Sequence, residues 1–139
     1  MSVSALFPIT DGVIVSALRA GFASAALSYS SGVTVARKLP DAHTARMVTV
    51  RNDSGPEEST QSRRRYGFNV WADDSVDAEK LALLAMAVLR RIPNGQPITA
   101  VDQLSGPFEV DDDPQMTVNN KNLTHFYFTA RVSVRGSSF

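Results

Sequence analysis

The stretch that decides the fold runs from residue 66 to residue 92. It reads YGFNVWA (66–72), DDSVDAEK (73–80), LALLAMAVL (81–89) and RRI (90–92). Tyr66, Phe68 and Val70 alternate with Gly67 and Asn69, a spacing that predicts a strand. The segment that follows begins with acidic residues, ends with two arginines and is followed by a proline. Because acids suit the positive start of a helix and arginines its negative end, the pattern predicts a helix over residues 76–92.

This predicted helix has no polar side chain between residues 81 and 89. A helix that is apolar all round must be covered all round, and one face of a small sheet does not do this. We therefore predict that a second copy of the chain covers part of it, with Leu81, Leu84 and Val88 at the subunit interface. Trp71 is a further interface candidate because tryptophan is enriched where interfaces bind most strongly. Its simpler interpretation is packing in the core or at a sheet edge.

The composition sets limits on the kind of protein. The chain has 139 residues, of which 43% are apolar and 20% charged, as is usual for one soluble domain. Fourteen basic residues balance 14 acidic ones, so no overall field favours nucleic acid or a membrane. The absence of cysteine excludes disulfides, thiol catalysis and cysteine metal sites. The sequence shows neither a secretory signal nor a membrane span, so we expect no membrane partner.

The remaining elements complete an α+β pattern. A first helix is expected over residues 11–27, capped by Thr10 or Asp11. Four further segments have the character of strands: residues 33–39, 46–51, 98–101 and 126–135. The order α-β-β-β-α-β-β predicts one domain, residues 1–139, with a mostly antiparallel sheet and two helices on one face.

Two polar stretches are predicted as arms of this domain. Residues 52–65 are expected to form the protruding tip of a hairpin, and residues 105–124 a long loop. The first arm carries Arg63, Arg64 and Arg65, with Glu57 and Glu58 nearby; the second carries Asp111, Asp112 and Asp113. We interpret both as partner-contact arms or as solvated loops. Direct DNA contact by the arginines is disfavoured, because no aromatic residues alternate with them and the chain is neutral.

The sequence offers little catalytic chemistry. It has no glycine-rich phosphate loop, and its histidines are His43, expected in a solvated turn, and His125, expected to have a capping or interface role. Two isolated histidines do not make a zinc site, and the three consecutive aspartates lack EF-hand spacing. Every Asp and Glu is expected in a loop or a helix cap. We therefore expect no catalytic residues, no metal and no cofactor.

Several segments together resemble a known family. They are the helix at 11–27, VTV (33–35), MVTVR (47–51), RYGFNVWA (65–72), DAE (77–79) and FYFTARVSVRG (126–136). With these, the chain resembles tail terminator proteins of long-tailed phages, which are also filed as minor tail or head–tail joining proteins. The most specific part is the strand ending in VWA, followed by an acid-started, alanine-rich helix. The resemblance extends over nearly the whole chain.

This resemblance implies a structural virion protein of the phage tail or neck, assembled in the host cytoplasm. Members of the family form a hexameric ring that caps the tail tube, stops its polymerisation and docks to the head. The implied partners are further copies of the chain, the tail tube protein and the head–tail connector or head-closure protein. Genomic DNA would pass through the ring without sequence recognition. The family has no catalytic residues to carry over.

Three alternatives remain open at this point. The chain could be another neck ring protein, with a head-closure or tail-completion role. It could be a small enzyme or ligand-binding domain that uses Arg37, His125 or Arg131, although its predicted inward residues are apolar. It could also bind nucleic acid through Arg63, Arg64 and Arg65, which would give a steep salt dependence.

Overall fold

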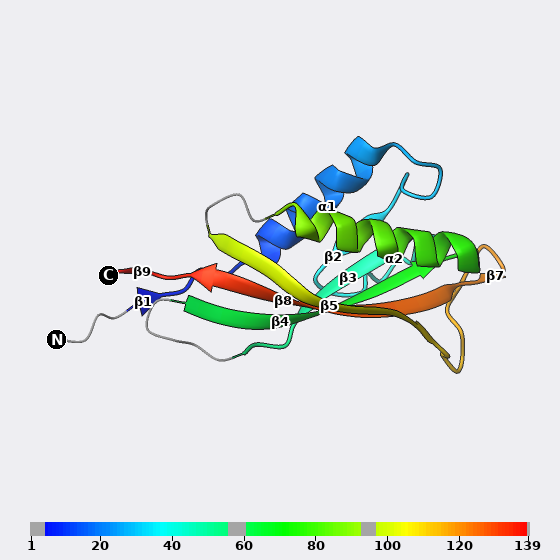
Figure 1. The fold of residues 1–139 in the computed structure, drawn as a ribbon. Helices are drawn as coiled ribbons and strands as arrows, with labels where there is room; N and C mark the ends of the chain where they lie inside the picture. The colour runs from blue at the N-terminus through cyan, green and yellow to red at the C-terminus, as the bar shows by residue number, and fades with distance from the viewer. Residues whose placement is uncertain (1–4, 56–60, 93–96, 139) are drawn as a thin grey trace.

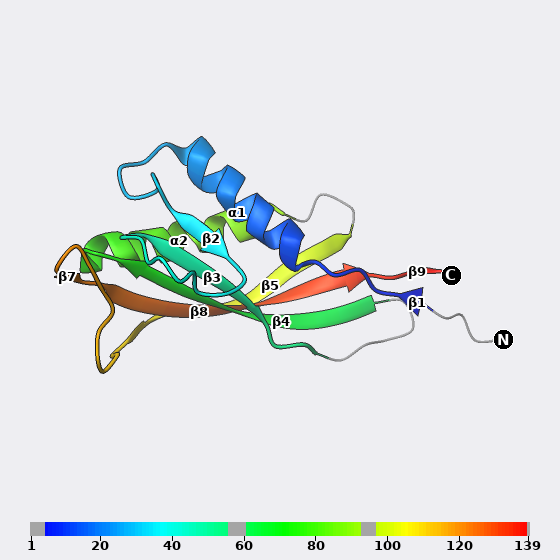
Figure 2. The ribbon, with the colours of Figure 1, turned by 180° about the vertical axis from the view of Figure 1, so that it is seen from behind.

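A computed structural model describes residues 5–55, 61–92 and 97–138 of the chain. Its main sheet has five strands in the order β2-β3-β4-β8-β5, and two helices cover one face of it (Figures 1 and 2). Only β2 and β3 pair in parallel within this sheet. The elements of this layer are α1 (Asp11–Ala25), β2 (Thr34–Ala36), β3 (Met47–Asn52), β4 (Gln61–Ala72), α2 (Ser75–Arg90), β5 (Ile98–Val110) and β8 (Thr124–Arg135). The α+β class, the element order and the mostly antiparallel sheet are therefore confirmed.

Two small strand pairs complete the fold. β1 (Ala5–Leu6) pairs with β9 (Ser137–Ser138), so the first and last strands lie side by side at one end of the sheet (Figure 1). β6 (Thr117–Val118) pairs with β7 (Lys121–Asn122) at the opposite end. In the described part of the chain, no helix is both long enough and apolar enough to cross a membrane.

The core lies between the sheet and the helices, where alternate residues of the two central strands face the same way. Phe68 of β4 lies opposite Phe128 of β8, and their rings stack with centroids 4.6 Å apart. Both are fully buried, as are their neighbours on this face, Tyr66, Val70 and Ala130. The alternation that predicted these strands is thus the alternation between a covered and an open face.

Helix α2 begins where the sequence predicts, because Asp74 caps it. The Asp74 carboxylate accepts hydrogen bonds from the backbone N–H groups of Val76 and Asp77, at 2.8 and 3.1 Å. Helix α1 begins at Asp11 as predicted, but the Thr10 side chain makes no capping bond. The hydroxyl of Thr10 lies instead 2.8 Å from that of Tyr66. Pro93, the predicted stop of α2, lies outside the described residues.

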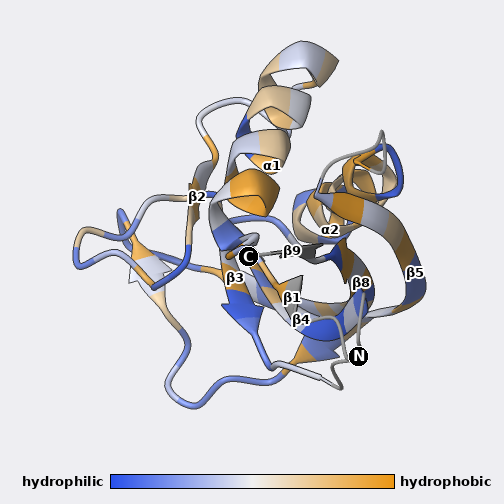
Figure 3. Ribbon diagram, turned by 90° about the vertical axis from the view of Figure 1, so that its left-hand side faces the viewer, coloured by the Kyte–Doolittle hydropathy of each residue, from blue (hydrophilic) through white to orange (hydrophobic). Residues whose placement is uncertain are grey.

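Most of the apolar surface of α2 is covered within one chain, which corrects the argument that a neighbour must cover it. Leu81 is fully buried and Val88 is 7% exposed. The cover comes from β4, β5 and β8 of the sheet below it and from α1, which lies beside α2 on the same sheet face (Figure 3). At Gly21 of α1 the absence of a side chain lets the helices approach, since an added Cβ would lie 2.6 Å from a methyl carbon of Val88.

Two further boundaries differ from the sequence predictions. β4 begins at Gln61, so Arg63, Arg64 and Arg65 lie within the sheet and not in a protruding arm. Residues 105–124 are not one long loop, since β5 continues to Val110 and the β6–β7 pair follows. β5 changes register with β8 at three places along its length. These irregularities break the strict alternation by which a strand is recognised in sequence.

Candidate functional site

The open face of the sheet is polar and rich in arginine. Every second residue pair of the β4–β8 register lies on this face, and one of these pairs is Arg65 opposite Arg131. Its other members include Arg51, Arg63, Asn69, Trp71, His125, Tyr127 and Arg135. Neither helix covers this face (Figure 2). At the β6–β7 end this face is covered, because Met47 and Trp71 are buried there against Leu123; the rest of it is not covered by a helix.

A pocket of about 390 Å³ opens on this face, and we call it the arginine pocket. It lies where the residues after β3 approach β4, β5 and β8. Its lining residues are Asp53, Ser54, Gly55, Arg63, Arg65, Gln103 and Arg131. Three arginines and one aspartate give it a positive character suited to carboxylates or phosphates.

The arginines of this pocket differ in how their charge is balanced. Arg131 binds Asp102 through two hydrogen bonds, at 2.8 and 2.9 Å, and this contact lowers the pKa of Asp102. Arg65 lies directly opposite Arg131, and its Nη2 donates to the neutral Gln103 side chain at 3.3 Å. Like charges directly opposite each other in a sheet are unfavourable. The pocket therefore has an excess of positive charge at Arg65.

An acidic turn lies at the other end of the same face, and it comprises Asp111, Asp112 and Asp113. His125 anchors it, because its Nδ1 lies 2.9 Å from an Asp112 carboxylate oxygen. The other ring nitrogen of His125 lies 2.7 Å from Asn69 Oδ1. Burial lowers the pKa of His125, and the nearby Asp112 partly opposes this shift. His125 thus fixes the root of the turn, a more specific arrangement than the sequence indicated.

The ring of Trp71 packs against the ring of His125. The two rings stack with centroids 4.4 Å apart, and Trp71 is only 7% exposed. Its indole N–H is buried and has no hydrogen-bond partner among the described residues. The simpler interpretation of Trp71 as a packing residue agrees with this environment, while a subunit contact at Trp71 stays a prediction.

A buried polar network joins the start of α1 to the sheet, and the sequence did not reveal it. Tyr66 donates a hydrogen bond of 2.6 Å to the Asp11 carboxylate, whose other oxygen is 3.1 Å from Arg37. Burial, followed by the bond to Asp11, raises the pKa of Tyr66 to about 12. Arg64 also faces this side, donating to the backbone oxygen of Pro8 at 2.6 Å. Arg64 therefore holds the N-terminal segment in place and is not part of an exposed arm.

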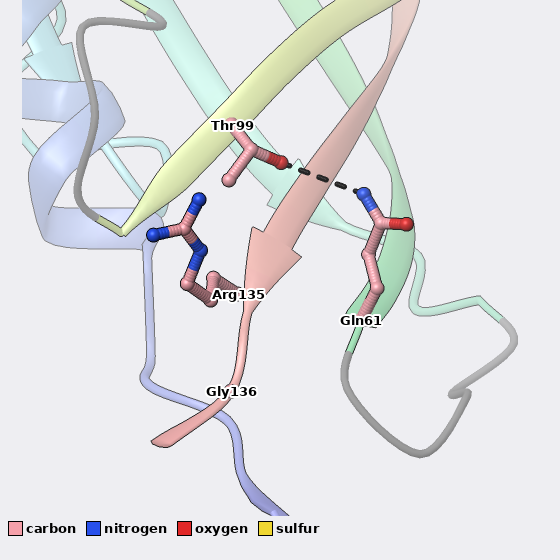
Figure 4. A pocket seen from close by; sticks show the side chains of 4 residues that line it. All are labelled: Gln61, Thr99, Arg135 and Gly136. Atoms are coloured by element: carbon pink, nitrogen blue, oxygen red, sulfur yellow. Dashed lines mark hydrogen bonds between the residues drawn. The ribbon is translucent and has the colours of Figure 1, made fainter.

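A second pocket, of about 420 Å³, opens at the end of the sheet near the chain termini (Figure 4). Gln61 and Thr99 lie on either side of the end of β8, and the Gln61 amide donates to the Thr99 hydroxyl at 3.5 Å. Arg135 and Gly136 complete its lining. One cation with two neutral polar groups can support polar contacts, but it does not form a nucleophile–base pair.

The fold does not bring together the three residues that an enzyme or ligand-binding domain was expected to use. Arg37, His125 and Arg131 each contact a different aspartate, in different parts of the fold. No group of three or more His, Asp or Glu side chains within the described ranges is arranged to hold a metal ion. The expectation that every acid lies in a loop or cap was wrong, because Asp102 and Glu109 lie in β5.

The remaining predicted site residues have three different outcomes. Leu81 and Val88 are buried against their own chain, so as the fold stands they cannot carry the subunit contact expected of them. Leu84 is partly exposed and keeps that possibility. Glu57 and Glu58 lie outside the described residues.

The fold and this surface define an α+β domain with one helix-covered and one open, charged sheet face. No family model matches the chain, and no curated protein does either. Among solved structures it is similar to a chain of the virion of native gene transfer agent (GTA) particle, with 14% sequence identity and a TM-score of 0.44. The alignment covers 88% of this chain and 98% of that one. This likeness assigns neither a family nor a function.

Proposed function

We propose that the chain is a structural virion protein that acts as a phage tail terminator and has no enzymatic activity. In this proposal several copies, six by the family resemblance, form a closed ring on the end of the tail tube. The ring stops tube polymerisation and presents a docking surface to the head connector. The sequence resemblance supports the tail terminator role, and the outer surface of α2 supports the ring.

The observation that carries the ring is an apolar stripe on the outside of α2. Val76 is 56% and Leu83 is 49% exposed, and Leu84 and Ala87 beside them are partly buried. These positions recur at helical spacing, so they lie along one side of the helix, which also carries the exposed Glu79 and Lys80 between Val76 and Leu83. Exposed apolar side chains with charged residues beside them suit a surface that binds another protein. We assign this stripe to the contact between neighbouring copies, in place of the buried Leu81 and Val88.

A closed ring requires that two different surfaces of each copy meet. Such heterologous contacts repeat around an axis and close when the rotation allows it. The charged groups of the open face suit contacts with the tube or the connector, because charges at the rim of an interface set partner choice and register. In this arrangement DNA passes through the ring and no base is read.

The experiment that tests this function is a tube-capping assay. The purified protein is added to the polymerising tail tube protein of the same virus, and tube lengths and ends are measured by electron microscopy. We expect shorter tubes with a ring of density at one end. The matched comparison adds the Leu83→Asp variant, for which we expect uncapped tubes. Tubes of unchanged length without a terminal ring would contradict the terminator function.

A further inference from the structure

The arginine pocket and the acidic turn have complementary charges, and both are exposed on one chain. The pocket gathers Arg63, Arg65 and Arg131, and within the described residues the Arg65 guanidinium donates a hydrogen bond to the neutral Gln103 and forms no ion pair. Guanidinium groups bind carboxylates through paired, charge-assisted hydrogen bonds. A carboxylate beside Arg65 would balance a charge that, unlike that of Arg131, has no carboxylate partner among the described residues.

The acidic turn supplies carboxylates of this kind. Asp111 and Asp113 are exposed, and neither forms an ion pair with any part of the chain that the structure describes. Asp112 between them is held by His125 at 2.9 Å. The turn is thus fixed at its centre while the carboxylates on both sides face solvent. A pre-positioned acidic group loses little conformational freedom when it binds.

The turn of one chain cannot reach the arginine pocket of the same chain. Arg131 pairs with Asp102 of β5, whereas His125 pairs with Val110 at the far end of the same strand pair. Six residues of extended strand separate Arg131 from His125, which is about 20 Å. The two surfaces can therefore meet only between different molecules, and such a head-to-tail contact can repeat around a ring.

Nucleic acid fits the pocket less well than a second copy does. The chain has 14 basic and 14 acidic residues, and its carboxylates would repel a phosphate backbone. The pocket lining also lacks the aromatic side chains on which bases stack. A single recessed cationic pocket fits an acidic turn better than it fits a continuous line of phosphates.

We propose that the arginine pocket of one copy binds the acidic turn of the next copy, with Asp111 and Asp113 approaching Arg65 and Arg131. This inference rests on the proposed ring and names a contact that holds it together. It assigns two surfaces, otherwise expected to face the tube or the connector, to each other. We expect the contact to form through side chains and not by adding a strand to the free edge of β5. The register shifts of β5 and Pro107 interrupt that edge.

Charge reversal tests the contact. One variant is Arg65→Glu, and a second carries Asp111→Lys and Asp113→Lys; both change exposed side chains. Each variant alone places like charges at the contact, so we expect self-association about tenfold weaker or more by sedimentation velocity. An equal mixture of the two should assemble again, because each reversed surface then meets an opposite charge. Lys38→Glu and Asp41→Lys, at exposed positions away from the pocket, are the matched controls.

The possible outcomes separate this contact from the ring itself. If the wild type assembles and the reversals leave assembly unchanged, the contact is wrong and the ring proposal stands. If the wild type forms open-ended assemblies that grow without limit, and the mixture of variants forms them too, the contact stands and the closed ring is wrong. If the wild type does not associate, the contact is overturned, and the tube-capping assay decides the function. Binding of a short DNA duplex is measured as well. If Arg65→Glu abolishes DNA binding without affecting assembly, the pocket binds phosphate and the proposed contact is wrong.

Discussion

At the scale of single residues, the buried bond between Tyr66 and Asp11 is the contact with the clearest energetic consequence. Tyr66 is fully buried and Asp11 is 6% exposed, so removing the hydroxyl leaves a buried carboxylate short of a donor. We expect Tyr66→Phe to lower the free energy of unfolding by about 1–3 kcal/mol at neutral pH. Chemical denaturation measures this, with Tyr29→Phe as the control, because the Tyr29 hydroxyl has no hydrogen bond to the described residues. Equal effects of the two changes would contradict the network.

The same tyrosine predicts a dependence on alkaline pH. The pKa of Tyr66 is about 12 in the folded chain and 10.0 for a free side chain. Between these values the unfolded chain has released its proton while the folded chain still holds it, so stability falls as pH rises. We expect Tyr66→Phe to reduce this alkaline loss of stability, as measured by denaturation at several pH values. A slope unchanged by the substitution would contradict the assignment.

His125 predicts the opposite limb of the pH profile. Burial lowers its pKa below 6.5, so the unfolded chain takes up a proton at a higher pH than the folded chain does. The wild type should therefore lose stability as pH falls through 6.5 towards the lower folded value. His125→Gln should flatten this part of the curve, and His43→Gln, at an exposed position, is the matched control variant. An unchanged slope in the His125 variant would contradict a difference in the pKa of the His125 imidazole between the folded and the unfolded chain.

At the scale of secondary-structure elements, the crossing of α1 and α2 depends on Gly21. An added methyl group there would lie 2.6 Å from a Val88 methyl carbon, whereas nothing lies within 4 Å of a Cβ at Gly12 in the same helix. We expect Gly21→Ala to destabilise the fold by about 1–3 kcal/mol and Gly12→Ala to stabilise it by up to about 1 kcal/mol. Thermal unfolding measures both. Adding Val88→Ala to Gly21→Ala should cost less than the two single changes together; simple additivity would contradict the close approach.

An aspartate introduced on the buried side of α2 should have a different effect from one introduced on its exposed side. Leu81 is fully buried, so Leu81→Asp should prevent folding. Leu83 is 49% exposed, so Leu83→Asp should keep the circular dichroism spectrum of the wild type but lose self-association. A Leu83→Asp variant that assembles like the wild type would remove the apolar stripe from the subunit contact.

The sequence predicted those elements whose residues alternate or repeat regularly. β8 was visible because five apolar residues alternate with polar ones, and α2 because acids, arginines and Asp74 mark its ends. The length of β5 was missed because its register shifts interrupt the alternation. The arginine pocket was missed because Asp102 and Gln103 lie in the part of β5 that was not predicted, and Asp102 meets Arg131 only through the pairing of β5 with β8. Contacts between strands distant in sequence have no signature in a single sequence.

At the scale of the whole molecule, each chain has two surfaces that its own fold does not use. One is the apolar stripe at Val76 and Leu83, and the other is the charged open face with its arginine pocket and acidic turn. Both would be covered in a ring of identical subunits joined head to tail. We therefore predict that an isolated chain is folded but incomplete as a functional unit.

The most direct test of this account is the mass of the purified protein in solution, measured by light scattering across a concentration series. One chain has a mass of 15.1 kDa. We predict a mass that reaches a plateau near six subunits and does not rise further, because a closed ring has no free contact surface left. A mass of one chain at every concentration, or a mass that grows without a plateau, would contradict the ring.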